Sequence, residues 1–340
     1  MYKHLAFLVI LFCICESVYI CHDDPNYPKW NNWTDAQIWT NSDNNQHGVP
    51  GQNDIVVIGR CSVVINDGLS VNVSGLITWA YGRVMIAGNL SITNDYSGSG
   101  QIFVNDTGNL NINKYFKNTG IITCLNILNM DTFSYDNSGQ IVLINSTLNL
   151  INTEQNLGMI TLYNSTVKSD RLIKIVNNTL TIYQNCSIVP GLDICQGILF
   201  IYQNSTLHTP SYNHHFGHLA IVPNKSLIIA NNVNILTNFK VHLENMINYN
   251  VIKFLIGESS FNTTFINLNN MIYCNDHYDI TVYQDSSSAS VFILKKHFDN
   301  KNVIFIIFAI ILVIIFAVIL IAIAYYKYRN NNIYHQLDDL

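Results

Sequence analysis

Four histidines lie close together in the second half of the chain, and side chains of this type could bind a metal ion. Protein zinc sites combine histidine with cysteine or carboxylate ligands at short, fixed spacings. No acidic residue or cysteine accompanies these histidines at such a spacing, so the pattern favours histidines exposed to solvent in a loop. They are His208, His214, His215 and His218. We therefore predict no metal site and no cofactor.

Carboxylates could support cleavage of a polysaccharide, because glycosidases use paired acidic groups as acid, base or nucleophile. The central aspartates do not recur at one position of the repeat described below, so the sequence places no two of them together. They are Asp131, Asp136, Asp170 and Asp193. We expect a protein without catalytic residues. A membrane-tethered, polysaccharide-acting enzyme of the lyase or glycosidase type is the alternative.

Cysteine pairing is a further chemistry open to this chain. Two of the eight cysteines lie in an N-terminal apolar segment that we expect to be removed. Cys186 and Cys195 flank one short corner and form the first expected disulfide, and Cys21 with Cys61 forms the second. Cys124 takes the place of an aliphatic residue in the repeat, which predicts a buried free thiol.

Acceptor sequences for N-linked glycans, Asn-x-Ser/Thr, recur along the chain and predict a glycosylated surface. Such sequences also arise by chance in a chain this rich in asparagine. The candidate asparagines are Asn32, Asn72, Asn89, Asn105, Asn145, Asn164, Asn177, Asn185, Asn204, Asn224 and Asn262.

Tyr163, Tyr183 and Tyr202 recur at one position of the repeat and should lie one above another on an outer face. Stacked, exposed tyrosines could contact a glycan chain or a protein partner. Cross-strand aromatic pairs also stabilise sheets without any ligand, and this structural role is favoured.

A fixed period positions all of these side chains. A glycine, or once an asparagine, recurs every 18 to 20 residues, and alternating aliphatic residues follow it two and four places later. This period predicts a solenoid whose strands turn their aliphatic side chains inward. The recurring positions are Gly82, Gly100, Gly120, Gly139, Gly158, Asn178, Gly197 and Gly217.

Six places after each glycine lies a corner position rich in amides, which strand alternation places inside the coil as a hydrogen-bonded ladder. Asn145 and Asn164 occupy this position, where no glycan would fit. Asn185, Asn204 and Asn224 fall one place later and are therefore the better glycosylation candidates.

Coils of this length, with aliphatic ladders and an asparagine corner, resemble right-handed parallel β-helices of the adhesin and pectate-lyase type. The resemblance covers residues 50–285 and implies an all-β fold. The preceding run Gly48–Ile58, with Trp30, Trp33 and Trp39 before it, resembles the entry segment of extracellular β-helices, and faintly the glycine-rich domain of cell-surface hyaluronan-handling proteins. We read the three tryptophans as a cap on the first coil, with sugar stacking as the alternative. The Asn-rich, Lys-poor composition resembles that of cell-surface proteins of social amoebae.

The two ends of the chain predict its topology. Residues 1–20 have the basic start and short apolar run of a signal peptide, with cleavage expected near Ser17 to Ile20. Residues 303–324 are 22 consecutive apolar residues and predict a transmembrane helix. Between them we expect a cap at 21–54, the β-helix at 55–285 and a stalk at 286–302, with a cytosolic tail at 325–340. Tyr334 and Leu337 in this tail match a tyrosine sorting signal for a cytosolic adaptor.

These features together predict a single-pass type I membrane glycoprotein of the plasma membrane that cycles through endosomes. Its ectodomain would serve recognition or adhesion, with an extracellular glycan or a cell-surface protein as partner. The formal net charge of −5 suggests no nucleic-acid partner.

Overall fold

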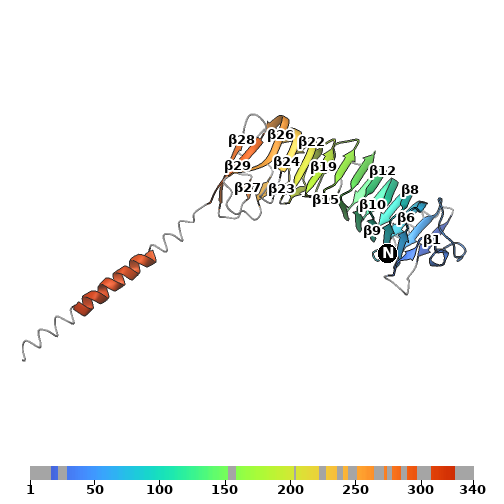
Figure 1. Cartoon of the computed structure of the whole chain (residues 1–340), viewed down its shortest axis with the longest axis horizontal. Helices are drawn as coiled ribbons and strands as arrows, with labels where there is room; N and C mark the ends of the chain where they lie inside the picture. The colour runs from blue at the N-terminus through green and yellow to red at the C-terminus, as the bar shows by residue number, and fades with distance from the viewer. Residues whose placement is uncertain are drawn as a thin grey trace, which may run out of the picture. The chain divides into compact units, whose positions relative to one another are not determined.

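The fold is built from parallel strands that stack coil upon coil. The computed structural model describes residues 17–21, 29–151, 158–202, 204–221, 227–235, 240–243, 251–263, 272–273, 278–284, 289–296 and 308–325. Within these ranges the chain forms a parallel β-solenoid with two long sheets, followed by one apolar helix (Figure 1). The predicted all-β fold with a C-terminal helix is therefore confirmed.

Each coil contributes a short strand to one sheet and a longer stretch of strand to the other. The 12-stranded sheet contains β2 (Asn31–Asn32), β5 (Ser62–Ile65), β7 (Arg83–Ile86), β9 (Gln101–Val104), β11 (Ile121–Cys124), β13 (Gln140–Ile144), β15 (Met159–Tyr163), β18 (Thr179–Tyr183), β21 (Ile198–Ile201), β23 (His218–Ile221), β25 (Lys240–Leu243) and β27 (Ile272–Tyr273).

The 17-stranded sheet contains β1 (Val18–Cys21), β3 (Thr40–Asn41), β4 (Ile55–Ile58), β6 (Ser70–Thr78), β8 (Asn89–Gly98), β10 (Asn109–Asn118), β12 (Ile127–Asn137), β14 (Thr147–Ile151), β16 (Thr166–Ser169), β17 (Ile173–Ile175), β19 (Asn185–Val189), β20 (Leu192–Ile194), β22 (Thr206–His214), β24 (Leu227–Ile235), β26 (Val251–Thr263), β28 (Tyr278–Gln284) and β29 (Ala289–Lys296).

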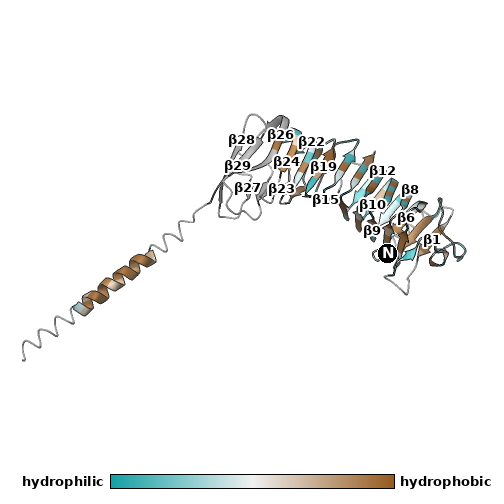
Figure 2. Ribbon diagram, in the orientation of Figure 1, coloured by the Kyte–Doolittle hydropathy of each residue, from teal (hydrophilic) through white to brown (hydrophobic). Residues whose placement is uncertain are grey.

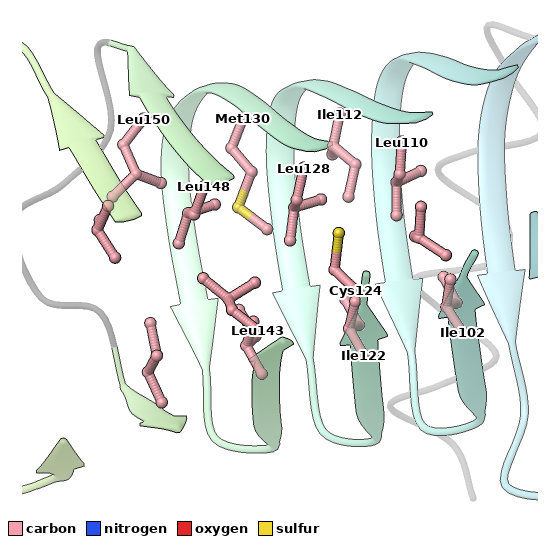
Figure 3. Packing of buried hydrophobic residues seen from close by; sticks show 14 of the residues in the cluster. Ile102, Leu110, Ile112, Ile122, Cys124, Leu128, Met130, Leu143, Leu148 and Leu150 are labelled. Carbon is pink, nitrogen blue, oxygen red and sulfur yellow. The ribbon is translucent and has the colours of Figure 1, made fainter. Parts of the chain in front are cut away.

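The predicted inward positions form the core between the two sheets. Ile141, Ile160 and Leu199 are fully buried, and Ile141 lies in register with Ile160 on the next strand. Figure 3 shows how aliphatic side chains from both sheets fill the space between them, with Cys124 among them. Cys124 is a buried free thiol, as expected, and burial raises its pKa to about 11. Each coil thus buries the apolar face of its neighbours, as solenoids require.

The recurring glycines are explained by how closely successive coils approach at one corner. A Cβ atom on Gly120 would overlap the carbonyl oxygen of Gly100, and one on Gly139 would overlap that of Gly120. The same contact recurs at Gly217, against the carbonyl oxygen of Gly197. Glycine, which has no Cβ atom, accommodates this close approach of the backbones without a clash, and this explains why it recurs at these coils.

The amide corner differs from the expectation. Asn145 and Asn164 are exposed, and the Asn164 side-chain amide donates to Asn145 Oδ1 at 3.0 Å on the outside of the coil. Their φ angles are +49° and +46°. A residue in this left-handed conformation breaks the two-residue alternation, so the next residues, Ser146 and Ser165, turn inward instead. Asparagine is among the few residues that adopt this conformation readily.

A buried amide ladder exists at a different corner, just before the glycine column. The Asn118 side-chain amide donates to Asn137 Oδ1 at 2.9 Å, and both side chains are buried. The Asn118 side chain also accepts a hydrogen bond from the backbone at this corner, because Gly120 N donates to Asn118 Oδ1 at 3.1 Å. The ladder that we expected after the strand of the smaller sheet thus lies before it.

The N-terminal cap pairs with the first coil. Trp33 and Trp39 are buried with ring centroids 4.9 Å apart, and Trp39 Nε1 donates to the Trp33 carbonyl oxygen. The expected disulfide between Cys21 and Cys61 is present and closes the cap onto this coil.

β1 bears on the expected leader cleavage. This strand, Val18–Cys21, pairs in parallel with β4. Cleavage after Ile20 would remove three of its four residues. A leader cleaved after Ser17, one of the expected positions, would leave this strand whole, with Cys15 and Ser17 as the small residues that signal peptidases require.

The solenoid and the C-terminal segment are two separate compact units. We expected a stalk at residues 286–302, but β29 lies within this range and pairs antiparallel with β26. The helix Phe308–Tyr325 is long and apolar enough to cross a membrane, and it is hydrophobic over almost its entire length (Figure 2). It covers most of the predicted span 303–324, whose first residues lie outside the described ranges. The tail with Tyr334 and Leu337 also lies outside them.

Candidate functional site

The three tyrosines form a continuous ladder on the outer face of the 12-stranded sheet. Ring centroids are 4.2 Å apart between Tyr163 and Tyr183, and 4.0 Å apart between Tyr183 and Tyr202. The interplanar angles of 7° and 23° make both contacts face to face. The coil-to-coil register of the strands holds this stack, since Tyr163 lies directly opposite Tyr183.

The stacking of the three rings determines which of their atoms a ligand can contact. Because both faces of Tyr183 are covered by its neighbours, the ladder presents ring edges and phenol groups rather than open ring faces. Burial, followed by hydrogen bonds with Tyr202 and Tyr163, raises the pKa of Tyr183. The ladder is therefore a ridge of linked phenol groups, suited to hydrogen bonding with a ligand and poorly suited to stacking on a sugar ring.

The strands around this ridge carry no charge. β13, β15, β18 and β21 contain no acidic or basic residue, and their outward side chains are aliphatic, hydroxyl, amide or aromatic. Thr161 and Thr181 lie in register beside the tyrosines. Met159 and Ile198 are 43% and 38% exposed, values typical of a surface with an apolar component. We name the outward residues of these four strands, with Tyr202, the tyrosine face.

Glycosylation candidates line the corner next to the tyrosine face. The exposed positions of Asn145 and Asn164 remove the expected conflict with the interior, so these two acceptors are as accessible as Asn185 and Asn204. Asn105 is half-buried, and the side chains of Asn224 and Asn262 lie outside the description. The other exposed candidates are Asn32, Asn72, Asn89 and Asn177.

The expected bridge between Cys186 and Cys195 is absent, and both residues are free thiols. Cys186 is buried in the core, in register with Leu207, and its thiol donates to the Tyr183 carbonyl oxygen at 3.2 Å. Cys195 is partly exposed, and burial together with the Asp193 carboxylate raises its pKa. Strand β19 turns Cys186 into the core, which sequence proximity to Cys195 does not reveal.

The histidines are not all exposed, in contrast to the expectation. His214 is fully buried, and its Nδ1 lies 2.7 Å from the Tyr212 hydroxyl. Burial, and next the charges of His215 and His218, lower the pKa of His214 to about 3. His215 Nε2 lies 3.2 Å from Asp193 Oδ1, so the adjacent coil supplies an acidic partner that spacing along the chain could not show.

In the described part of the chain no three His, Cys, Asp or Glu side chains are placed to hold a metal ion. Asp131, Asp136 and Asp170 are exposed, whereas Asp193 is buried beside His215. Asp193 and His215 form a single carboxylate–imidazole pair.

Sequence reasoning missed a second aromatic ladder, which is structural. Tyr96, Phe116 and Tyr135 are buried, with successive ring centroids 5.4 and 4.9 Å apart. The register of β8, β10 and β12 stacks them. Their shared position in the longer strand of each coil was the signal that could have revealed the ladder.

A comparison of the chain with protein-family models, curated proteins and solved structures returned no match. The fold and the site therefore define the class of protein. The chain is a β-solenoid protein with one candidate transmembrane helix. More narrowly, these features are compatible with a single-pass membrane protein whose solenoid is its ectodomain.

Proposed function

We propose that this protein is a type I membrane glycoprotein whose β-solenoid recognises a glycan or a cell-surface protein, in recognition or adhesion at the cell surface. The observation that carries the proposal is the tyrosine face, an uncharged surface with an ordered ridge of phenol groups. The signal peptide expected at residues 1–20 and the apolar helix Phe308–Tyr325 support the topology. The resemblance to adhesin-type β-helices supports the role.

The proposal includes the location and the tail. The plasma membrane is the expected site of action, and the exposed glycan acceptors beside the tyrosine face suit an extracellular surface. Tyr334 and Leu337 would bind a cytosolic adaptor and return the protein through endosomes. A polysaccharide-acting enzyme, the alternative, would instead release shortened chains from a bound glycan, and analysis of the released sugars would detect them.

Replacing Tyr163, Tyr183 and Tyr202 together by serine should weaken binding to cells by about tenfold or more, because truncation of central aromatic residues removes much of an interface's affinity. The triple phenylalanine variant separates contact from stability. It keeps the stacked rings and removes the hydroxyl groups that the ridge presents, so we expect it to fold normally and to lose binding as well. The measurement is cell and glycan-array binding by the full-length chain in nanodiscs.

The replacement Thr123→Ser, on the same sheet but outside the tyrosine face, is the control and should bind as the wild type does. Unchanged binding by both tyrosine variants would leave the ladder with a purely structural role. Loss of binding by the serine variant alone, accompanied by a lower melting temperature, would also indicate a purely structural role for the ladder.

A further inference from the structure

One corner of the solenoid is longer than its counterparts. Trp79–Tyr81 connect β6 to Gly82, whereas single residues, Ser99 and Thr119, make the same connection in the next two coils. Insertions into one coil of a solenoid do not alter the stack, and they map to loops that often belong to a binding face. This insertion therefore calls for a reason other than folding.

The inserted residues form a tight turn that holds two large aromatic side chains at the surface. Gly82 N donates to the Trp79 carbonyl oxygen at 2.8 Å, which closes a four-residue turn. Trp79 is 52% exposed and Tyr81 is 67% exposed. The Trp79 ring lies over Gly59, where a Cβ atom would be only 3.4 Å from the ring. Much of each of these two side chains is thus accessible at this corner, whereas both faces of Tyr183 are covered in the tyrosine ladder.

An arginine and a third aromatic residue lie immediately beside this turn. The Arg83 guanidinium is 4.9 Å from the ring centroid of Trp30, two strands away. Arg83 reaches across Ser62, its neighbour in register, and Ser62 is fully buried. Ser62 Oγ has no hydrogen-bond partner among the described residues. Stacking on the Trp30 ring therefore helps to hold the arginine in place.

Two arginines lie near this turn in a chain that has few charges. Only 11% of the residues are charged, and two of the four arginines, Arg60 and Arg83, lie in this corner and the next strand. Arg83 N donates to the Cys61 carbonyl oxygen, which joins two successive coils at this corner. The backbone of Arg60 in one coil therefore lies near that of Tyr81 in the next. In the described part of the chain Arg83 makes no ion pair.

We propose that this corner, formed by Trp30, Trp79, Tyr81 and Arg83, binds an anionic sugar. Exposed aromatic side chains suit the apolar side of a pyranose ring. A guanidinium group forms paired hydrogen bonds with a carboxylate or a sulfate, and both groups occur on acidic sugars. This site lies apart from the tyrosine face and does not depend on its role.

The test measures binding of short oligosaccharides to the full-length chain in nanodiscs by calorimetry. The probes are an oligogalacturonate, which carries carboxylates, a heparin-derived tetrasaccharide, which also carries sulfates, and a neutral laminari-oligosaccharide. We expect at least one acidic probe to bind, no binding of the neutral probe, and weaker binding at high salt. The probe that binds identifies the anionic group.

Arg83→Gln should weaken this binding by about tenfold or more, as expected for loss of hydrogen bonds to a charged group. Arg171→Gln is the matched control, because Arg171 is an exposed arginine elsewhere on the solenoid, and it should bind normally. Trp79→Ala tests the aromatic contribution at an exposed position and should also weaken binding. Binding of neither acidic probe, equal binding of the neutral probe, or equal affinity of the Arg83 and Arg171 variants would overturn the proposal. The triple tyrosine variants should bind the acidic probe normally, which separates this site from the proposed function.

Discussion

Gly120→Ala should prevent the solenoid from folding normally. The added Cβ atom would overlap the carbonyl oxygen of Gly100 and press on the backbone of Ser99. These atoms cannot move aside, because the same carbonyl accepts the backbone hydrogen bond from Ile121 N at 3.0 Å. Relief requires the two coils to separate, which also disrupts the packing of β9 against β11. We expect a loss of more than about 3 kcal/mol in the free energy of unfolding, a size that is reached only by severe packing defects.

The measurement is the melting temperature of the purified protein, together with the amount that reaches the cell surface. Gly51→Ala is the matched control, because a Cβ atom there meets only Asp54 Oδ2 at an ordinary contact distance of 3.5 Å. The control should behave as the wild type does. A Gly120→Ala protein with an unchanged melting temperature would show that close approach of the backbones does not explain the glycine period.

Acidification should loosen the solenoid around β22, because His214 is buried in its neutral form beside Tyr212. The pKa of His214 is lowered from the ordinary 6.5 to about 3 in the folded protein. Between these two pKa values His214 therefore binds a proton in the unfolded chain but stays neutral in the folded chain. This contribution to stability is complete above pH 6.5 and is lost progressively as the pH falls from 6.5 towards 3. Between pH 7.5 and pH 5 the expected loss is about 2 kcal/mol.

Hydrogen exchange of the peptide that covers β22, corrected for the intrinsic effect of pH, measures this loss locally. The double variant Tyr212→Phe/His214→Leu replaces both polar partners by apolar groups and should remove most of the pH dependence without a large change in stability at pH 7.5. His208→Leu is the control at an exposed position and should keep the full pH dependence. Equal pH dependence in the double variant and the wild type would show that His214 is not responsible.

The coil architecture could be predicted because it repeats. Each aliphatic position is occupied many times over, so the inward face was evident from alternation alone, and Ile141 and Ile160 lie in register as expected. The same reasoning placed the three tyrosines one above another. In a solenoid, residues one repeat apart in the sequence contact each other in neighbouring coils, so these contacts can be predicted from the sequence.

The corners could not be predicted by counting. A single residue with positive φ, such as Asn145, reverses the side to which the next residues point, and sequence alternation contains no mark of this reversal. Cys186 faces the core for reasons of the same kind. The pairing of Asp193 with His215 was missed because the two residues belong to adjacent coils. The corner around Trp79 was missed because it departs from the repeat on which the prediction relied.

Engineered cysteines at positions in register test the central claim, an in-register parallel solenoid, most directly. Thr161 and Thr181 lie opposite each other on the outward side of neighbouring strands. Neighbouring strands are separated by about 4.8 Å, within the range that a disulfide can bridge. Thr161→Cys/Thr181→Cys should therefore form an intramolecular disulfide under mild oxidation, detected by peptide mapping of the monomer. Thr123→Cys/Thr181→Cys, which places the thiols three strands apart in the same column, should not. Cross-linking of the second pair but not the first would contradict the register and, with it, the tyrosine face.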